Sequence, residues 1–252
     1  MLTDKNTPYS IREDVIDSAI QQIIDSREKI ILIHGGGSFG HPLAKKYSLS
    51  DGKNASVENQ VLGLAETHEA MNRFNSIIIN KFIEKKVPAL SIQASSIFIK
   101  KNGKTILNSI EQTESCLNLN IIPILYGDII IDTNYSFSII SGDDIALELC
   151  RNLKEYNVSK VIYAMETDGI WVNDEEVGNA LCQEIKSDDL DSINLANLTN
   201  KIDVTGGIKG KISSIKKLCE CNVQVQLING LKHKYILKAL KNQDLECTKV
   251  MK

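Results

Sequence analysis

The sequence Ile31-Leu-Ile-His-Gly-Gly-Gly-Ser-Phe-Gly-His-Pro-Leu-Ala-Lys-Lys-Tyr47 joins a short apolar run to a loop rich in glycine. The run from Ile30 to Ile33 predicts a buried strand, and Pro42 is typical of the first turn of a helix, where its missing N–H is not needed. Between a strand and a helix start, bare backbone N–H groups converge on one place, which favours the binding of a phosphate. His41 adds a side-chain donor there.

Two other interpretations of this glycine loop compete with a phosphate cradle. The loop can be a tight turn that merely needs glycine, or a dinucleotide fingerprint, because Gly35, Gly37 and Gly40 fit G-x-G-x-x-G. The fingerprint also needs a second strand that ends in an acidic residue about 20 residues further on. Residues 48–57 are polar and turn-like instead. The sequence therefore favours a cradle for a phosphorylated small molecule over a dinucleotide site.

The composition of the 252 residues is that of a globular protein, with 42% hydrophobic and 24% charged residues. A net charge of −3 provides no basic surface for nucleic acid. The sequence contains no apolar signal core and no run of 18 apolar residues, so we expect a cytoplasmic protein without a membrane partner. None of the six cysteines forms a C-x-x-C pair, which predicts reduced, mostly buried thiols.

Hydrophobic periodicity predicts strands that alternate with helices along the chain. The predicted strands are residues 30–33, 87–93, 96–100, 104–107, 121–125, 129–132, 137–140, 160–165 and 223–228. The predicted helices are residues 11–26, 61–84, 111–119, 145–156, 188–198, 233–240, and a helix that opens within 203–211 and runs to Cys219. This alternation predicts an α/β protein, with an open, mostly parallel sheet and helices on both faces.

The predicted helix 61–84 carries an apolar stripe at three- or four-residue steps. Its members are Leu64, His68, Met71, Phe74, Ile78 and Phe82. Such a stripe usually belongs to the core, but after a phosphate loop it can also form the wall of a pocket for an apolar substrate tail. For His68 we expect a hydrogen-bonded core histidine rather than a ligand.

Polar clusters fall at the ends of predicted strands or the starts of predicted helices. These clusters are residues 34–41, 141–144, 166–169 and 205–211. Ligands of open α/β sheets bind beyond the carboxyl ends of the strands, so the clusters are candidates for one site. Their glycines, lysines and carboxylates suit phosphoryl transfer, in which catalysis depends on positioning and on neutralising charge.

Each candidate residue in these clusters also has a simpler, purely structural interpretation. Lys211 can reach back over the glycine turn to a phosphate, or it can be a solvated helix lysine. Asp143 and Asp144 can hold magnesium or orient a lysine, or they can cap a helix. Asp168 can be an ATP-side carboxylate or a turn residue before Gly169.

Taken together, these motifs closely resemble those of the isopentenyl phosphate kinases, a group within the amino acid kinase family. The matching segments are His34–His41 with Pro42 and Lys45-Lys46-Tyr47, Tyr126-Gly-Asp128, Ser141-Gly-Asp-Asp144, Thr167-Asp-Gly-Ile170 and Asp203-Val-Thr-Gly-Gly-Ile-Lys-Gly-Lys211. The resemblance runs nearly end to end. Its most specific element is the first loop with its terminal histidine.

The resemblance implies the transfer of a phosphoryl group from ATP, with Mg²⁺, to isopentenyl phosphate in isoprenoid biosynthesis. It implies one amino acid kinase domain over residues 1–252, with an acceptor-binding lobe at about 1–150 and a nucleotide-binding lobe at about 151–252. It also implies a cytoplasmic homodimer with a small-molecule isoprenoid phosphate as its partner. The alternatives are a related kinase, such as a fosfomycin kinase, and a phosphate-ligand binding protein without turnover.

The resemblance also implies a role for particular residues of this sequence. His41 and Lys5 correspond to catalytic residues. Gly36, His41 and Gly142 correspond to the acceptor site, and Gly37, Asp168, Gly206 and Lys211 to the ATP site.

One feature of the family pattern is not found in this sequence. The family has a strand and a Lys-x-Gly-Gly-Ser loop directly before its Thr-Asp-Lys segment, whereas here Met1-Leu2 precedes Thr3-Asp-Lys5. We therefore expect that the first strand of the family fold is missing from this chain and that the start codon has been placed too far downstream. A genuine loss would favour the binding protein without turnover.

Overall fold

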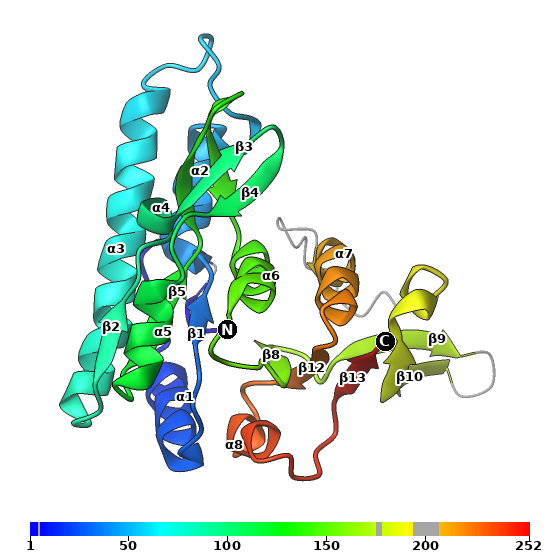
Figure 1. Ribbon diagram of the computed structural model, residues 1–252. Helices are drawn as coiled ribbons and strands as arrows, with labels where there is room; N and C mark the ends of the chain where they lie inside the picture. The colour runs from blue at the N-terminus through cyan, green and yellow to red at the C-terminus, as the bar shows by residue number, and fades with distance from the viewer. Residues whose placement is uncertain (5, 175–177, 194–206) are drawn as a thin grey trace. The chain divides into compact units, whose positions relative to one another are not determined.

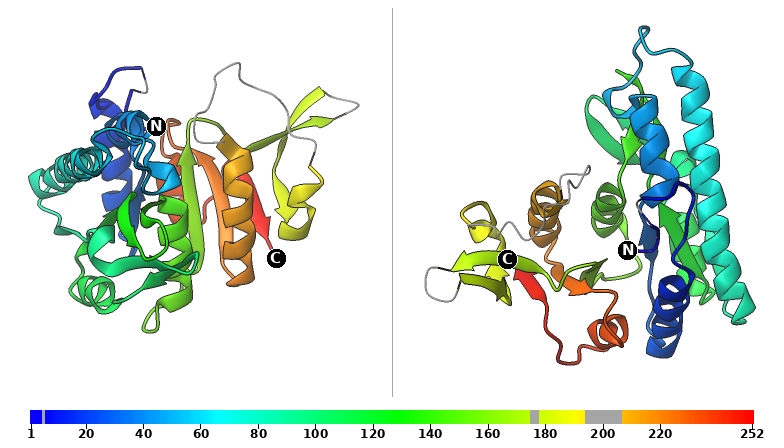
Figure 2. Two further views of the ribbon diagram at one scale, coloured as in Figure 1. Left: turned by 90° about the horizontal axis from the view of Figure 1, so that it is seen from above. Right: turned by 180° about the vertical axis from the view of Figure 1, so that it is seen from behind.

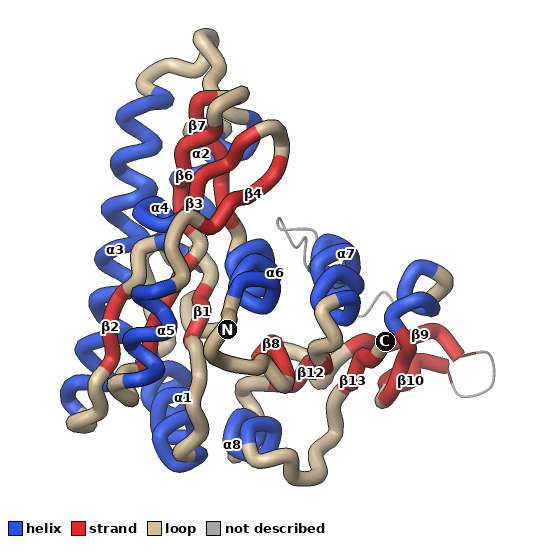
Figure 3. The backbone as a smooth tube through the Cα atoms, viewed as in Figure 1, coloured by secondary structure: helices blue, strands red, loops and turns tan. Residues whose placement is uncertain are grey.

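The computed structural model describes residues 1–4, 6–174, 178–193 and 207–252 (Figures 1 and 3). It divides into two compact units, one formed by Leu2–Tyr156 and the other by Asn157–Lys252 with Met1. In the described ranges, no helix is both long enough and apolar enough to cross a membrane.

The unit Leu2–Tyr156 is built on a parallel sheet of three strands in the order β1-β5-β2. These strands are β1 (Leu32–His34), β5 (Ile122–Tyr126) and β2 (Ala89–Ser91). His34 pairs in register with Tyr126, so β1 and β5 reach the same edge of the sheet with their carboxyl ends. This edge is where a ligand of an open parallel sheet is expected.

Helices cover both faces of this sheet (Figures 1 and 2). On one face lie α1 (Glu13–Ser26) and the long α3 (Gln60–Glu84), and on the other lie α5 (Glu111–Asn118) and α6 (Gly142–Asn152). Because side chains alternate along a strand, Leu125 packs with Cys116 and Ile145 on the α5–α6 face. His34 and Tyr126 point to the opposite face, where α3 provides their polar partners.

A second, mostly antiparallel sheet in the same unit has the order β4-β3-β6-β7. Its strands are β4 (Lys104–Leu107), β3 (Phe98–Lys101), β6 (Asp128–Asp132) and β7 (Ser136–Ile140), and the short α4 (Ala94–Ile97) and the 3-10 turn η1 (Leu49–Asp51) lie next to it. The predicted strand 96–100 was wrong at its start, because α4 occupies residues 94–97. There Ala94 and Ile97 are buried and the Ser96 N–H donates to the Gln93 carbonyl.

The unit Asn157–Lys252 contains a four-stranded sheet in the order β11-β13-β12-β8. Its strands are β11 (Glu184–Lys186), β13 (Thr248–Met251), β12 (Gln224–Asn229) and β8 (Lys160–Met165); β9 (Ile170–Asp174) and β10 (Gly178–Cys182) form a hairpin. In Figure 1, α7 (Gly207–Glu220) and α8 (Tyr235–Leu240) lie on opposite faces of β12. The predicted α/β class with parallel strands and helices on both faces is confirmed.

The predicted helix 188–198 is only partly within the described residues. Residues 187–191 form the 3-10 turn η2 (Ser187–Asp191) instead of an α-helix, and residues 194–198 lie outside the described part of the chain. All six cysteines are free thiols, as predicted; three are buried and three are half-buried.

Candidate functional site

The glycine loop is followed by α2 (Gly37–Lys46), which begins five residues before Pro42. The prediction that Pro42 stands in the first turn was therefore wrong. Pro42 has no N–H to donate to the carbonyl of Ser38, and the N–H of Tyr9 donates to that carbonyl instead, at 3.2 Å. A hydrogen bond from another segment thus replaces the one that proline removes, and the helix continues through it.

The start of α2 packs closely against α3. A Cβ atom on Gly40 would stand 2.8 Å from the sulfur of Met71, and one on Gly36 would stand 3.3 Å from Cδ2 of His41. The rings of Phe39 and Phe74 stack at a centroid distance of 4.7 Å. Because glycine has no Cβ atom, the backbone of α2 can approach α3 closely at Gly36 and Gly40. This packing fixes the position of the glycine loop.

The first backbone N–H groups of α2 are available to a ligand. Those of Gly36 and Gly37 make no hydrogen bond within the described chain, and Gly37 has a positive φ of 48°. The next one, Ser38 N–H, donates to Oγ1 of Thr3 at 3.1 Å. Two free donors at the positive end of a helix form a ready site for an anion.

A second helix start lies at the same end of β1. A Cβ atom on Gly142, the first residue of α6, would stand 3.2 Å from Cγ2 of Ile33 and 3.9 Å from the carbonyl oxygen of His34. The N–H of Gly142 has no partner among the residues with described positions, and Gly127 N–H donates to the His34 carbonyl at 3.1 Å. The positive ends of α2 and α6 therefore meet at the carboxyl end of β1.

Of the two carboxylates beside Gly142, Asp144 has a structural role. Oγ of Ser141 accepts a hydrogen bond from Asp144 N–H at 3.1 Å, and the Asp144 carboxylate accepts one from Ser141 N–H at 3.3 Å. This capping box starts α6, which was the simpler alternative for the pair. Asp143, in the first turn of α6, stays a candidate for an active-site role.

His41 lies on α2, next to the cradle formed by Gly36 and Gly37, and its side chain is exposed. It was predicted to hold the acceptor phosphate, and its Cδ2 atom lies 3.3 Å from the position that a Cβ atom on Gly36 would occupy. Lys5, predicted as its catalytic partner, lies outside the described residues.

His34, the last residue of β1, is buried and packs between the rings of Phe74 and Tyr126. Burial lowers the pKa of His34 to about 4, so its imidazole is neutral near pH 7. The sequence analysis included His34 in a polar cluster without assigning it a role.

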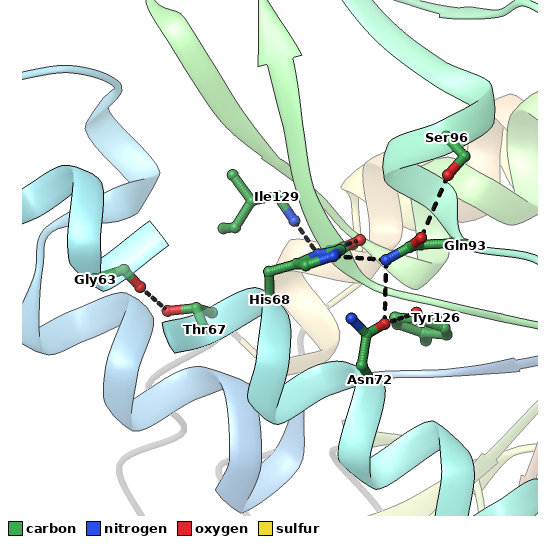
Figure 4. A network of polar contacts seen from close by, with 9 residues as sticks. Gly63, Thr67, His68, Asn72, Gln93, Ser96, Tyr126 and Ile129 are labelled. Carbon is green, nitrogen blue, oxygen red and sulfur yellow. Dashed lines mark hydrogen bonds and ion pairs between the residues drawn. The ribbon is translucent and has the colours of Figure 1, made fainter. Parts of the chain in front are cut away.

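A polar network lies on the inner face of α3 (Figure 4). Nδ1 of His68 lies 2.8 Å from the buried carboxylate of Asp128, and its Nε2 lies 2.6 Å from Nε2 of Gln93. Gln93 and the hydroxyl of Tyr126 both donate to Oδ1 of Asn72. His68 is hydrogen-bonded, as expected, but its side chain is 30% exposed, so it lies at the margin of the core rather than within it.

This pairing could not be predicted from the sequence, because Asp128 is 60 residues from His68. The available signal was the position of Asp128 directly after the predicted strand that ends near Tyr126. Burial and the neighbouring Asp128 raise the pKa of Tyr126 to about 12, which keeps its hydroxyl a donor.

Most of the apolar stripe on α3 belongs to the core. Met71, Phe74, Ile78 and Phe82 are buried. Leu64, one turn from the N-terminus of the helix, is half-buried against a cluster formed by Tyr47, Leu49, Ile129 and Phe137. Leu64 and His68 are the members of the stripe that are not fully buried.

In the unit Asn157–Lys252, Asp168 follows β8 and forms an ion pair with Lys232 at 2.5 Å. Lys232 also contacts Glu246 at 3.1 Å, and the two carboxylates raise its pKa. Thr248 accepts a hydrogen bond from Ile170 N–H at 2.8 Å and so fixes the turn after Asp168. Asp168 is thus held in a defined position at the end of a strand.

Lys211, on α7, places its ammonium 4.9 Å from the ring centroid of Tyr163 on β8. This contact holds a positive charge over the strand that leads to Asp168. Gly206, predicted to bind ATP beside it, lies outside the described residues. In the parts of the chain with described positions, no three histidine, cysteine or acidic side chains gather as a metal site.

An α/β fold in which two helix starts face one strand end is typical of proteins that bind phosphorylated small molecules. The sequence model of the amino acid kinase family matches residues 1–229, and the chain belongs to this family.

Named relatives point to one branch of the family. Isopentenyl phosphate kinase of Methanocaldococcus jannaschii is 38% identical over 95% of this chain and 91% of its own length. That of Thermoplasma acidophilum is 28% identical over 91% of this chain and 88% of its own length.

Solved structures have the same fold. One isopentenyl phosphate kinase structure superposes with a TM-score of 0.78 at 25% identity, over 96% of this chain and 92% of its own. A substrate complex of isopentenyl phosphate kinase superposes with a TM-score of 0.76 at 23% identity, over 99% and 95% of the two chains.

Proposed function

We propose that this protein transfers the γ-phosphoryl group of ATP to isopentenyl phosphate, forming isopentenyl diphosphate and ADP. The observation that carries the proposal is the cradle at the end of β1, where the N–H groups of Gly36, Gly37 and Gly142 have no partner in the described chain. A relative named isopentenyl phosphate kinase aligns with 95% of this chain. Isopentenyl phosphate is therefore the first acceptor to test.

On the acceptor side, the reaction brings together two groups of negative charge. Gly36 and Gly142 N–H groups bind the acceptor phosphate, and Gly37 N–H faces the phosphoryl group in transfer. His41 donates a hydrogen bond to the acceptor phosphate and offsets its negative charge, so that it can approach the phosphoryl group of ATP. The acceptor oxygen is already ionised, so the step needs positioning and charge neutralisation rather than a general base.

On the donor side, Lys211 and Gly206 bind the ATP phosphates, and Asp168, held by its ion pair with Lys232, borders the nucleotide. By the family resemblance, Lys5 acts on the transferred group. Magnesium enters with ATP, because Mg²⁺ in kinases is held largely by phosphate oxygens and water, with one or two carboxylates; Asp143 is the candidate among these.

The tail of the acceptor packs along the part of α3 from Leu64 to Met71. Half-buried Leu64 provides apolar surface there, and the buried Met71 lies behind the glycine loop, whereas His68 contributes the edge of an imidazole that is already paired with Asp128. We further expect a homodimer in the cytoplasm. Light scattering on the purified protein tests the oligomeric state directly.

The decisive experiment is an ADP-release assay with Mg-ATP and isopentenyl phosphate, run beside fosfomycin and inorganic phosphate as acceptors. The proposal expects the largest kcat/KM with isopentenyl phosphate and formation of its diphosphate by mass spectrometry. A higher kcat/KM with fosfomycin would identify the related kinase instead. Tight binding of isopentenyl phosphate by calorimetry, without ADP release, would identify a binding protein.

A further inference from the structure

Each ring nitrogen of His34 lies next to an oxygen atom that can only accept a hydrogen bond. Its Nδ1 lies 3.1 Å from the carbonyl oxygen of Gly35, and its Nε2 lies 3.2 Å from Oδ1 of Asn75 on α3. A neutral imidazole has only one N–H, so it can donate to only one of them. The imidazolium form would donate to both, but burial lowers the pKa of His34 to about 4 and excludes that form near neutral pH.

The Asn75 amide can remove this conflict by turning over. The oxygen and nitrogen of an amide are nearly equal in size, so half a rotation exchanges them without moving other atoms. Nδ2 of Asn75 then donates to Nε2 of His34. Oδ1 accepts from the hydroxyl of Ser91, which lies 2.7 Å from the other end of the amide and turns its proton from the Tyr126 hydroxyl to Oδ1.

In this arrangement each contact has one donor and one acceptor, and Nδ1–H of His34 donates to the Gly35 carbonyl. The opposite tautomer would leave the Nδ1 lone pair facing the Gly35 oxygen inside the protein, where neither group can bind water. Buried polar groups without partners are strongly disfavoured. The surroundings of His34 therefore select the Nδ1–H form.

We propose that His34 is a positioning residue for the proposed phosphate transfer: as the Nδ1–H tautomer selected by Asn75, it holds the Gly35 carbonyl and thereby aims the Gly36 N–H at the anion. The two groups belong to one peptide unit, and in a trans peptide the C=O and N–H point in opposite directions. Anchoring the Gly35 oxygen on the protein side directs the Gly36 N–H away from His34, and this N–H has no other partner in the described chain.

The same residue is linked to the rest of the cradle through its own backbone. The carbonyl of His34 accepts from Gly127 N–H at 3.1 Å and lies 3.9 Å from the position of a Cβ atom on Gly142. Stacking against Tyr126, at a centroid distance of 5.3 Å, fixes the plane of the imidazole ring. His34 thus connects the starts of α2 and α6 to a single, rigid side chain.

The direct test is long-range ¹H–¹⁵N NMR of histidine-labelled wild-type protein at pH 7, which reports which ring nitrogen carries the proton. Only four histidines contribute, and His34 is assigned by the signals lost in His34→Phe. The proposal expects the Nδ1–H pattern for His34 and its loss or mixing in Asn75→Leu. An Nε2–H pattern or an imidazolium in the wild type overturns it, whichever acceptor the enzyme uses.

Kinetics test the consequence for the cradle, which rests on the proposed function. His34→Phe keeps the aromatic packing but loses the donor, and we expect kcat/KM for isopentenyl phosphate to fall by about 10²-fold. His34→Asn can place its Nδ2–H near the position of Nδ1, and we expect it to recover at least about tenfold of this loss. The KM for ATP should stay unchanged in both variants. Equal losses in the two variants, or a loss on the ATP side alone, contradict a role through Gly36.

A titration with inorganic phosphate separates failure of this inference from failure of the proposed function. If isopentenyl phosphate is not the acceptor, phosphate should still shift the Gly36 amide signal in the wild type, and this shift should be lost in His34→Phe. A Gly36 signal that responds equally in both proteins would show that His34 does not aim this N–H.

Discussion

The sulfur atom of Met71 stands 2.8 Å from the point that a Cβ atom of Gly40 would occupy. Replacing Gly40 by alanine therefore requires the Met71 side chain, or the helix that carries it, to shift at the glycine cradle. Overpacking of this kind costs about 1–3 kcal/mol, and we expect Gly40→Ala to lower the free energy of unfolding by that amount in urea titrations.

Truncation of Met71 provides the matched control for this contact. In Gly40→Ala combined with Met71→Ala, the new methyl group has room, so the double variant should be more stable than the sum of the two single changes predicts. Strict additivity would mean that the two residues do not compete for this space.

The side chain of His41 should matter for turnover more than for folding. His41→Ala removes one donor to the acceptor phosphate, whose negative charge must approach that of the phosphoryl group, and such a loss lowers kcat by about 10²–10³-fold. Lys45→Ala, an exposed change on the same helix, is the control in the ADP-release assay. If His41→Ala turned over at the wild-type rate, His41 would have no part in the mechanism.

Lys211 should act on the nucleotide. A charged hydrogen bond to phosphate contributes about 1.5–3 kcal/mol, so Lys211→Met should raise the KM for ATP by roughly 10–100-fold, with little change in the KM for the acceptor. Tyr163→Leu removes the ring below the ammonium while keeping the charge, and it should produce a smaller rise in the same constant. A larger effect on the acceptor than on ATP would place Lys211 elsewhere.

The buried His34 makes stability depend on pH. Its pKa is lowered from 6.5 to about 4 by burial, so between these values the unfolded chain binds more protons than the folded one. The free energy of unfolding should therefore fall as the pH drops through this window, by about 2 kcal/mol between pH 7 and pH 5 from this group alone. His34→Phe cannot titrate, and the difference between the two proteins isolates the effect; parallel pH profiles would argue against a neutral His34 in the fold.

Substitutions of Asp143 and Asp144, the two neighbouring carboxylates of α6, should affect different properties. Asp144→Ala removes half of the capping box, and we expect the free energy of unfolding to fall by about 1 kcal/mol. Asp143→Asn should leave stability within about 0.5 kcal/mol of the wild type and lower turnover at limiting Mg²⁺. If Asp143→Asn has full activity at every magnesium concentration, the active-site role proposed for Asp143 is wrong.

Local patterns predicted the helices and strands well, because periodicity depends on neighbours in the sequence. The strands Lys104–Leu107 and Lys160–Met165 have their predicted bounds, and the long α3 begins one residue earlier than predicted. Pro42 was placed wrongly because the hydrogen bond that allows it inside a helix comes from Tyr9, far outside the window that a sequence pattern covers.

The candidate site shows the same division between local and distant effects. The glycine loop, His41 and the Ser141-Gly-Asp-Asp144 helix start can be recognised from single short segments. The partners of His68 and His34 cannot, since Asp128 and Asn75 are 60 and 41 residues away and become neighbours only when α3 packs on the sheet. Capping was one of two roles open for Asp144, and only the geometry of Ser141 decides for it.

The hydrogen bond between Tyr9 and Ser38 has a practical consequence. Residues 2–4 and 6–12 contact α2 at Ser38 through Thr3, Tyr9 and Ser10, directly beside the free N–H groups of the cradle. Because these residues hold the start of α2, a change made in them reaches the anion site, although they lie outside the glycine loop.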